Sequence, residues 1–253
     1  MRMKKLIFFI VSISSVICVN AQNPESLMEK ANNLFVEGKY EQALEVYNSI
    51  LNEGYESTDL YYNIGNTYYK QKGIAKAILN YERALLLDPN NEDVKYNLEL
   101  CNRLVVDQIE ILPVFFITAW VRSFRNLFSS NVWAYISMIT FAIALIFISF
   151  YLYSKGVGFK KLSFWLGFVL VLLSLSSFIF SKSQKERIIN GRTAIIISPS
   201  VTVKSAPDTS GTDLFVIHEG TKVIIEDKIS DWSEIKLSDG SKGWLNKKDL
   251  EPI

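Results

Sequence analysis

The sequence predicts a multidomain membrane protein with three parts: an all-α repeat solenoid, a two-helix transmembrane hairpin and a C-terminal all-β barrel. Two stretches, 126–154 and 162–181, contain no charged residue. Each reaches the roughly 20 residues that a helix needs to cross a bilayer. A pattern that repeats every 34 residues precedes these stretches, and short alternating runs separated by turn residues follow them.

The first residues are typical of a signal peptide, which we place at 1–21. Basic residues at positions 2, 4 and 5 precede an apolar run at 6–19, which is short for a membrane span. Val19 and Ala21 are small enough for cleavage after Ala21. An uncleaved anchor is the alternative, and either form would send the following residues across the membrane.

The region 22–108 contains an internal repeat. Ala31, Leu34, Tyr40, Ala43, Tyr47 and Ile50 recur 34 positions later as Gly65, Tyr68, Ile74, Ala77, Tyr81 and Ala84. This period and spacing resemble the tetratricopeptide repeat (TPR). In such a repeat, small residues let two helices approach closely and aromatic residues fill the space between neighbouring repeats. We expect two repeats followed by a capping helix near 92–104.

The resemblance implies a peptide-binding groove on the first helix of each repeat and on the cap. The matching positions are Met28, Asn32, Phe35, Tyr62, Asn63, Asn66, Tyr69, Tyr96 and Asn97. Met28 and Asp93 stand where a carboxylate-binding groove would place Lys or Arg. We therefore expect a neutral peptide backbone, held by asparagine amides and packed on tyrosines. The alternative is that the tyrosines are packing residues and the asparagines are solvated.

The middle of the chain is predicted to anchor it in the membrane. Segment 109–131 combines aromatic residues with Arg122 and Arg125 and suits an interfacial amphipathic helix, with a linker packed on the spans as the alternative. The domain boundaries continue with helices at 132–153 and 162–181, a loop at 154–161 and a linker at 182–192. Neither span contains an ionisable residue, which favours anchoring over transport.

The charges give conflicting signals about orientation. Three lysines in the loop 154–161 favour a cytoplasmic loop, whereas five basic residues on the opposite flanks favour the reverse. The basic N-terminal signal is followed directly by an acidic region, 22–110, with 8 Lys+Arg against 15 Asp+Glu. We therefore expect both soluble domains to lie in the periplasm, anchored to the bacterial inner membrane. The same acidic balance argues against nucleic-acid binding.

Residues 193–253 are predicted to form a small β-barrel. Five strands are expected near 201–203, 214–217, 222–226, 232–237 and 243–245, with tight turns at Glu219-Gly220 and Asp239-Gly240. The sequence motifs at 201–207 and 239–245 resemble those of the bacterial SH3 (SH3b) family. This resemblance implies binding of cell-wall peptides or partner proteins. Trp232 and Trp244 are the candidate surface residues, with burial in the core as the alternative.

The sequence offers no catalytic residues, metal site or cofactor site. His218 is the single histidine, and Cys101, the one cysteine left after signal cleavage, lies in a different domain. A nucleophile needs a base close by, and the chain lacks phosphate-binding loops and metal-ligand motifs. We therefore expect that the protein is not an enzyme.

The order of signal, repeat, interfacial segment, two spans and SH3b domain resembles the BatE-type proteins of the Bacteroides aerotolerance (Bat) group. This resemblance implies an envelope protein that works beside membrane-anchored von Willebrand A-domain proteins and a MoxR-type ATPase, in stress or oxygen tolerance. We expect a non-catalytic scaffold that assembles such a complex. A protein that binds or senses peptidoglycan through its SH3b domain is the alternative.

Overall fold

The computed structural model describes residues 23–109 and 115–253. The predicted signal peptide and residues 110–114 of the predicted interfacial segment lie outside the described residues. The chain divides into two units, one that ends at Tyr55 and one that begins at Glu56, and each is described by itself.

The first unit contains a helical hairpin. Helix α2 (Pro24–Val36) begins after Asn23, whose side chain accepts a hydrogen bond from the N–H of Glu25 at 3.2 Å. Gly38 has a φ of +76°, which turns the chain into α3 (Tyr40–Asn52). Ala31 of α2 and Ala43 and Tyr47 of α3, three positions of the repeat pattern, are all buried.

The second unit begins with three helices: α4 (Thr58–Lys70), α5 (Ile74–Leu87) and α6 (Glu92–Asn102). The side chains of Ser57 and Asn91 cap α4 and α6, each accepting a backbone N–H at 3.1 Å. Where α4 meets α5, a Cβ added at Gly65 would lie 2.6 Å from the Tyr81 ring. The glycine is therefore required for this close approach of the two helices.

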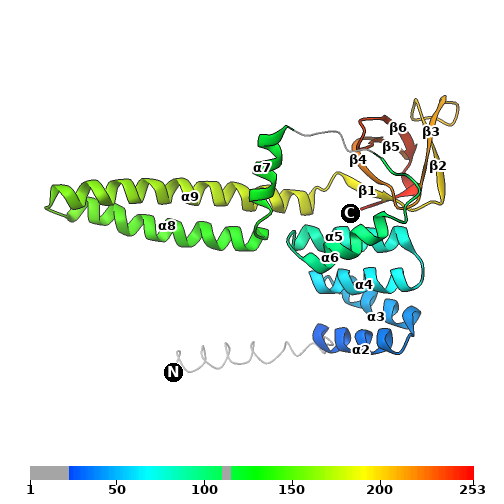
Figure 1. Ribbon diagram of the computed structural model, residues 1–253, viewed down its shortest axis with the longest axis horizontal. Coiled ribbons are helices and arrows are strands. Elements are labelled where there is room, and N and C mark those ends of the chain that lie inside the picture. The colour runs from blue at the N-terminus through cyan, green and yellow to red at the C-terminus, as the bar shows by residue number, and fades with distance from the viewer. Residues whose placement is uncertain (1–22, 110–114) are drawn as a thin grey trace, which may run out of the picture. The chain divides into compact units, whose positions relative to one another are not determined.

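Three further helices follow, α7 (Phe116–Arg125), α8 (Ser130–Tyr153) and α9 (Val157–Ile189). Helices α8 and α9 lie side by side (Figure 1), and both are long and apolar enough to cross a membrane. The structure corrects two predicted boundaries. The expected loop 154–161 is helical from Val157, and the expected linker 182–192 is helical to Ile189, because the charged residues after Ser181 do not break a helix.

Small polar residues join α8 to α9. The Ser137 hydroxyl donates to the carbonyl oxygen of Ser174 at 2.9 Å, and the Ser174 hydroxyl donates back to the carbonyl oxygen of Ser137 at 3.0 Å. Gly167 lies against Phe147 of α8. Small residues let two apolar helices approach closely, which is the packing expected of a membrane hairpin.

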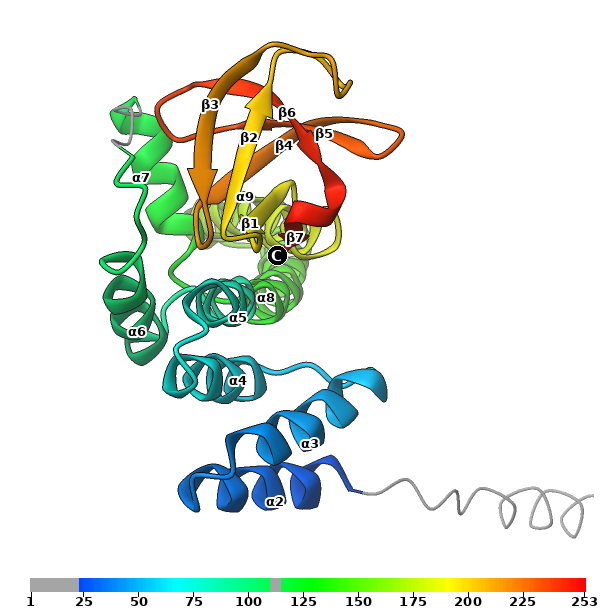
Figure 2. The ribbon, with the colours of Figure 1, turned by 90° about the vertical axis from the view of Figure 1, so that its right-hand side faces the viewer.

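The C-terminal region forms an antiparallel sheet with the strand order β3-β2-β6-β5-β4-β1-β7 (Figure 2). Its elements are β1 (Thr193–Ile196), β2 (Ser200–Lys204), β3 (Asp213–His218), β4 (Lys222–Ile229), β5 (Trp232–Lys236), β6 (Lys242–Asn246), the 3₁₀ helix η1 (Lys247–Asp249) and β7 (Leu250–Pro252). The five predicted strands are present, and β1 and β7 are additional.

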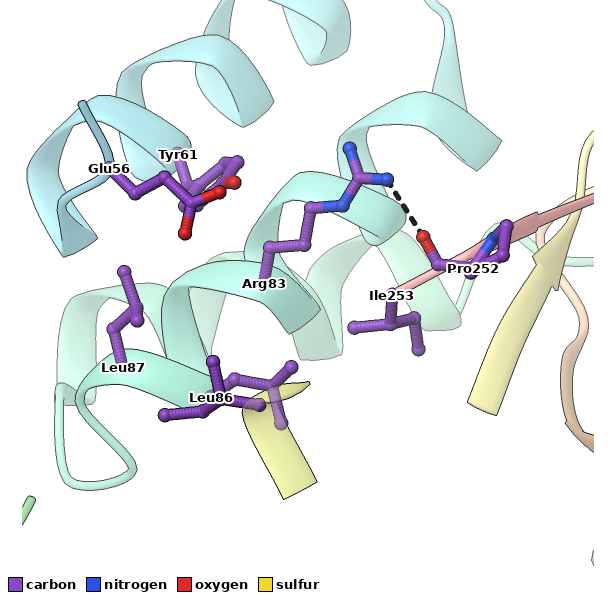
Figure 3. A pocket seen from close by; sticks show the side chains of 8 residues that line it. Glu56, Tyr61, Arg83, Leu86, Leu87, Pro252 and Ile253 are labelled. Atoms are coloured by element: carbon purple, nitrogen blue, oxygen red, sulfur yellow. Dashed lines mark hydrogen bonds between the residues drawn. The ribbon is translucent and has the colours of Figure 1, made fainter. Parts of the chain in front are cut away.

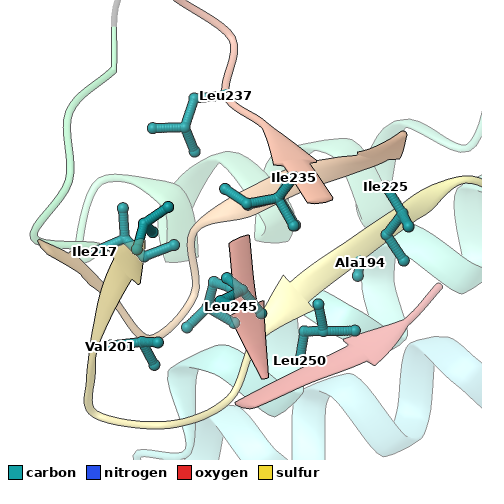
Figure 4. Close-up of a cluster of buried hydrophobic side chains, with 11 residues drawn as sticks. Ala194, Val201, Ile217, Ile225, Ile235, Leu237, Leu245 and Leu250 are labelled. Atoms are coloured by element: carbon teal, nitrogen blue, oxygen red, sulfur yellow. The ribbon is translucent and has the colours of Figure 1, made fainter. Parts of the chain in front are cut away.

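All seven strands contribute to one core of apolar side chains (Figure 4). Alternate residues point inward, for example Val201 and Val203 of β2 and Val223 and Ile225 of β4. The strands are short, and the inward-facing side chains of all seven fill one common core. This is the arrangement of a small barrel. The predicted fold class is therefore confirmed.

Candidate interaction surfaces

A hydrogen-bond network connects α4, α5 and α6. The side-chain amide of Asn97 donates to the Oδ1 atom of Asn66 at 2.9 Å and to the Tyr62 hydroxyl at 3.2 Å. The Tyr81 hydroxyl donates to the same Asn66 oxygen at 2.7 Å. Burial raises the pKa of Tyr81 above its ordinary value, so its hydroxyl remains a donor. The Asn66 oxygen therefore holds three helices together.

The network brings together three of the predicted groove residues, namely Tyr62, Asn66 and Asn97. Tyr62, Asn66 and Tyr69 share one face of α4, since they follow at intervals of four and three residues. Asn63, also on α4, is half-buried like these three. Tyr96 of α6 is 69% exposed and is the most accessible aromatic side chain of the set.

The other three predicted groove residues lie on α2 in the first unit. The Tyr47 hydroxyl donates to the Oδ1 atom of Asn32 at 2.6 Å, which is the counterpart of the Tyr81–Asn66 bond 34 positions later. The Phe35 ring lies 5.5 Å from the Tyr40 ring, and Met28 is half-buried. In both repeats the asparagine therefore has a structural role beside its predicted binding role.

A contact that the sequence analysis missed joins the helices to the sheet. One carboxylate oxygen of Asp107 accepts the backbone N–H of His218 at 2.6 Å and the Thr221 hydroxyl at 2.7 Å. The other oxygen lies 2.8 Å from Nδ1 of His218. Burial raises the pKa of Asp107, but these hydrogen bonds outweigh burial and hold the pKa below its ordinary value. The ionised carboxylate is therefore the form that this contact favours.

Helix α5 makes a second contact with the sheet. Arg83 donates to the Glu251 carboxylate at 3.1 Å and to the Pro252 carbonyl oxygen at 2.7 Å, and Lys222 pairs with Glu82 at 2.6 Å. A pocket of about 320 Å³ opens beside Arg83 (Figure 3). Its lining combines Glu56, Tyr61 and Arg83 with aliphatic side chains, and it holds none of the predicted site residues.

The tryptophans of the sheet lie outside its core. Successive side chains of a strand point to opposite faces. Ser233 and Ile235 of β5 point into the core, so the Trp232 side chain points outward. Leu245 of β6 points into the core, so the neighbouring Trp244 side chain also points outward. Both rings are half-buried. Glu226 of β4 forms salt bridges with Lys236 of β5, at 3.8 Å, and with Lys242 of β6. The two lysines are paired across β5 and β6. The outer face therefore combines aromatic rings with paired charges.

The described residues include no group of three or more side chains that could hold a metal ion. Cys101 is fully buried in α6, and burial raises the pKa of its thiol to about 11. The thiol is therefore neutral near pH 7 and inaccessible, which are the properties of a packing residue rather than a nucleophile.

Comparison with known families agrees with the two soluble parts. Residues 58–91 match the family model of the tetratricopeptide repeat, and residues 199–251 match that of the bacterial SH3 domain. No curated protein matches the chain. The tetratricopeptide repeat and the bacterial SH3 domain are both interaction modules and are typically non-catalytic. The two matches therefore indicate binding of proteins or of peptidoglycan.

Proposed function

We propose that the protein is a non-catalytic, membrane-anchored scaffold that assembles an envelope protein complex. The observation that carries this proposal is the contact of Asp107 with His218 and Thr221. It joins the helical repeat to the SH3b domain and leaves Tyr96 exposed for a partner. A scaffold of this kind presents two binding modules in one fixed arrangement.

The anchor of the scaffold is the α8–α9 hairpin, which we place in the bacterial inner membrane. Asp107 precedes the hairpin and His218 follows it, so their contact requires both soluble domains to lie on the same side of the bilayer. An even number of spans satisfies this requirement. We assign the shared side to the periplasm, on the strength of the basic N-terminus and the acidic repeat that follows it. Protease added to spheroplasts should then cleave the SH3b domain, and its protection would contradict this orientation.

The partners that we propose follow from the resemblance to the Bat group. They are membrane-anchored von Willebrand A-domain proteins, with peptide segments of these proteins in the repeat groove and a role in stress or oxygen tolerance. Two sets of residues are proposed to bind such segments, each within its own unit: the α2 set (Met28, Asn32, Phe35) and the set on α4 and α6 (Tyr62, Asn63, Asn66, Tyr69, Tyr96, Asn97). Asn66 is a poor residue for a test, because its oxygen already joins three helices.

The experiment replaces Tyr96, whose ring is 69% exposed, with alanine and uses Tyr55→Ala, at a ring 47% exposed, as the matched control. The tagged full chain is purified from native membranes in mild detergent, and its partners are identified. We expect von Willebrand A-domain proteins with the wild type and with Tyr55→Ala, and their loss with Tyr96→Ala. Unchanged capture by Tyr96→Ala would refute the groove.

A second function, binding or sensing of peptidoglycan through the SH3b domain, is favoured by the outward position of Trp232 and Trp244. Trp is enriched at interaction surfaces, and each of these rings is partly accessible on the outer face of the sheet. The full chain in detergent should then bind purified wall fragments, and Trp232→Ala with Trp244→Ala should abolish this binding, whereas Trp165→Ala in α9 should not. No binding by the wild type at millimolar ligand would leave the SH3b domain as a protein-interaction module.

A further inference from the structure

Helix α7 is fixed to the end of the α8–α9 hairpin. The Gln184 side-chain amide of α9 donates to the carbonyl oxygens of Arg125 and Phe128, at 2.8 and 2.9 Å. The Trp133 indole N–H of α8 donates to the same Arg125 oxygen at 2.8 Å. Gln184 is buried, so these bonds are shielded from water. The C-terminal end of α7 therefore has a defined position beside the point where the charge-free part of α9 ends, at Ser181.

Aromatic rings gather at this level of the hairpin. The Trp133 ring lies 5.2 Å from the Phe180 ring, 5.9 Å from the Phe124 ring and 5.2 Å from the Phe128 ring. Trp120 of α7 is 70% exposed. Aromatic belts of this kind mark the boundary between hydrocarbon and headgroups. In a bilayer, α7 would therefore lie at the depth of the lipid phosphates.

Three arginines lie near one another at the same level, since each feels the positive charge of at least one of the others. Arg122 and Arg125 are three residues apart and share a face of α7. Arg125 donates to the Ser183 hydroxyl of α9 at 3.2 Å, and Arg187 lies one helical turn beyond Ser183. Burial, together with the positive charges of Arg187 and Arg122, lowers the pKa of Arg125, which agrees with three cations in one cluster.

The nearby carboxylates already have other partners. Glu82 pairs with Lys222 at 2.6 Å, and Glu186 lies 3.9 Å from Lys182. Both glutamates line a cavity of about 510 Å³ together with Ser183 and Arg187. Within the described part of the chain, none of the three arginines forms a salt bridge with a carboxylate. Burial and the positive charge of Arg122 lower the pKa of Arg187, and the negative charge of Glu82 opposes this shift only in part, so the cluster keeps an excess of positive charge.

We propose that Arg122, Arg125 and Arg187 bind the phosphate of an anionic phospholipid headgroup. A guanidinium presents paired N–H donors that match phosphate oxygens, and three of them can hold one phosphate from different sides. The exposed Trp120 ring of α7 offers a surface for the glycerol and acyl region of the same lipid. This site rests on the proposed membrane hairpin and adds a lipid ligand to it.

The test uses the full chain in nanodiscs that contain equal amounts of phosphatidylglycerol and phosphatidylcholine. Native mass spectrometry measures the phosphatidylglycerol molecules retained by each protein molecule. Each basic residue contributes about fivefold in affinity at an anionic surface, so replacing all three arginines with glutamine should weaken retention by about 100-fold.

Two matched variants separate a built site from diffuse attraction. Replacing Lys155, Lys160 and Lys161 with glutamine removes the same charge at the opposite end of the hairpin. Replacing the three arginines with lysine keeps the charge and removes the paired donors. We expect the arginine-to-lysine variant to lose most of the retention and the loop variant to keep it. Equal losses in the loop and arginine-to-glutamine variants, or full retention with lysine, would overturn the site.

Two further measurements identify the ligand and separate this proposal from the membrane hairpin. An excess of inorganic phosphate should leave the lipid bound, and its displacement would assign the cluster to free anions instead. Alkaline extraction of vesicles reports insertion independently of lipid choice. A wild-type protein released by alkali would refute the hairpin and the lipid site together. A protein that stays inserted but shows no preference for phosphatidylglycerol would refute the lipid site alone.

Discussion

Replacing Asp107 with alanine should loosen the helices of the second unit from the sheet. The substitution removes the acceptor of three contacts, at 2.6, 2.7 and 2.8 Å. A hydrogen bond to a charged group contributes about 1.5–3 kcal/mol, and bonds that share one carboxylate do not add fully. We therefore expect a loss of about 3 kcal/mol in the free energy of this contact, which corresponds to a roughly 100-fold larger population of the open form.

Hydrogen exchange on the full chain in detergent measures this opening directly, because the backbone N–H of His218 is itself one of the donors to Asp107. Exchange should accelerate by about 100-fold at His218 and in the segment 103–109, with less change in the sheet core. Asp213→Ala is the matched control, since Asp213 lies on the same strand but pairs with Lys204. Unchanged exchange at His218 in Asp107→Ala would show that the contact does not hold the two parts together.

The contact should also depend on pH. The pKa of Asp107 is lower in the folded protein than its ordinary value of about 3.9, so folding favours the ionised carboxylate. This contribution is fully present above the ordinary pKa and is lost as the pH falls through the folded pKa. Protection of the His218 amide in the wild type should therefore hold down to about pH 4 and decline below it. Asp107→Ala should lack this decline.

Three further substitutions or reagents test the packing. Tyr81→Phe removes the hydroxyl that donates to Asn66 and should lower the stability of the helical repeat by about 1 kcal/mol. Thermal unfolding followed by circular dichroism measures this loss. A change within error would mean that this hydrogen bond does not contribute to stability. Gly243→Ala places a Cβ 2.5 Å from the Val203 side chain and should destabilise the sheet by about 1–3 kcal/mol. Tryptophan fluorescence during denaturation measures this loss, and an unchanged stability would contradict the crowding. Cys101 should resist maleimide at pH 7 until the protein is denatured, whereas rapid labelling of the folded protein would show that the thiol is accessible.

The repeat and most of the sheet were predictable because their signals are local. The small and aromatic positions of the repeat recur at a fixed period, and α2, α4 and α6 begin 34 residues apart as that period requires. Strands such as β2 alternate inward and outward residues, which a sequence pattern records directly. The prediction of these elements therefore needed no knowledge of tertiary contacts.

The missed strands lack such a signal. The run in β1 is apolar at three successive positions rather than alternating, because Ala194, Ile195 and Ile196 are all buried. Strand β7 contains Pro252, which removes a backbone donor and argues against a strand in sequence. It is tolerated because β7 lies at the edge of the sheet and pairs with β1 alone. Both strands are thus defined by tertiary contacts.

The extent of α9 was misjudged for a different reason. The predicted end at 181 followed the loss of hydropathy, but charge ends a membrane span and does not end a helix. The helix continues until Asn190-Gly191, a pair that is a familiar stop signal. This continuation places Ser183, Gln184 and Arg187 beside α7. The predicted linker therefore carries one of the three arginines of the proposed lipid site and the residues that hold α7 beside α9.

The contact between Asp107 and His218 lies beyond any local signal, because the two residues are 111 positions apart and the hairpin separates them. Its position bears on how the proposed scaffold would work. Two modules on flexible tethers would each have to be ordered when a partner binds both, at a cost in conformational entropy. Here the segment after α6 already ties the repeat to the sheet, so a partner that contacts α6 and the SH3b domain meets both in their final arrangement.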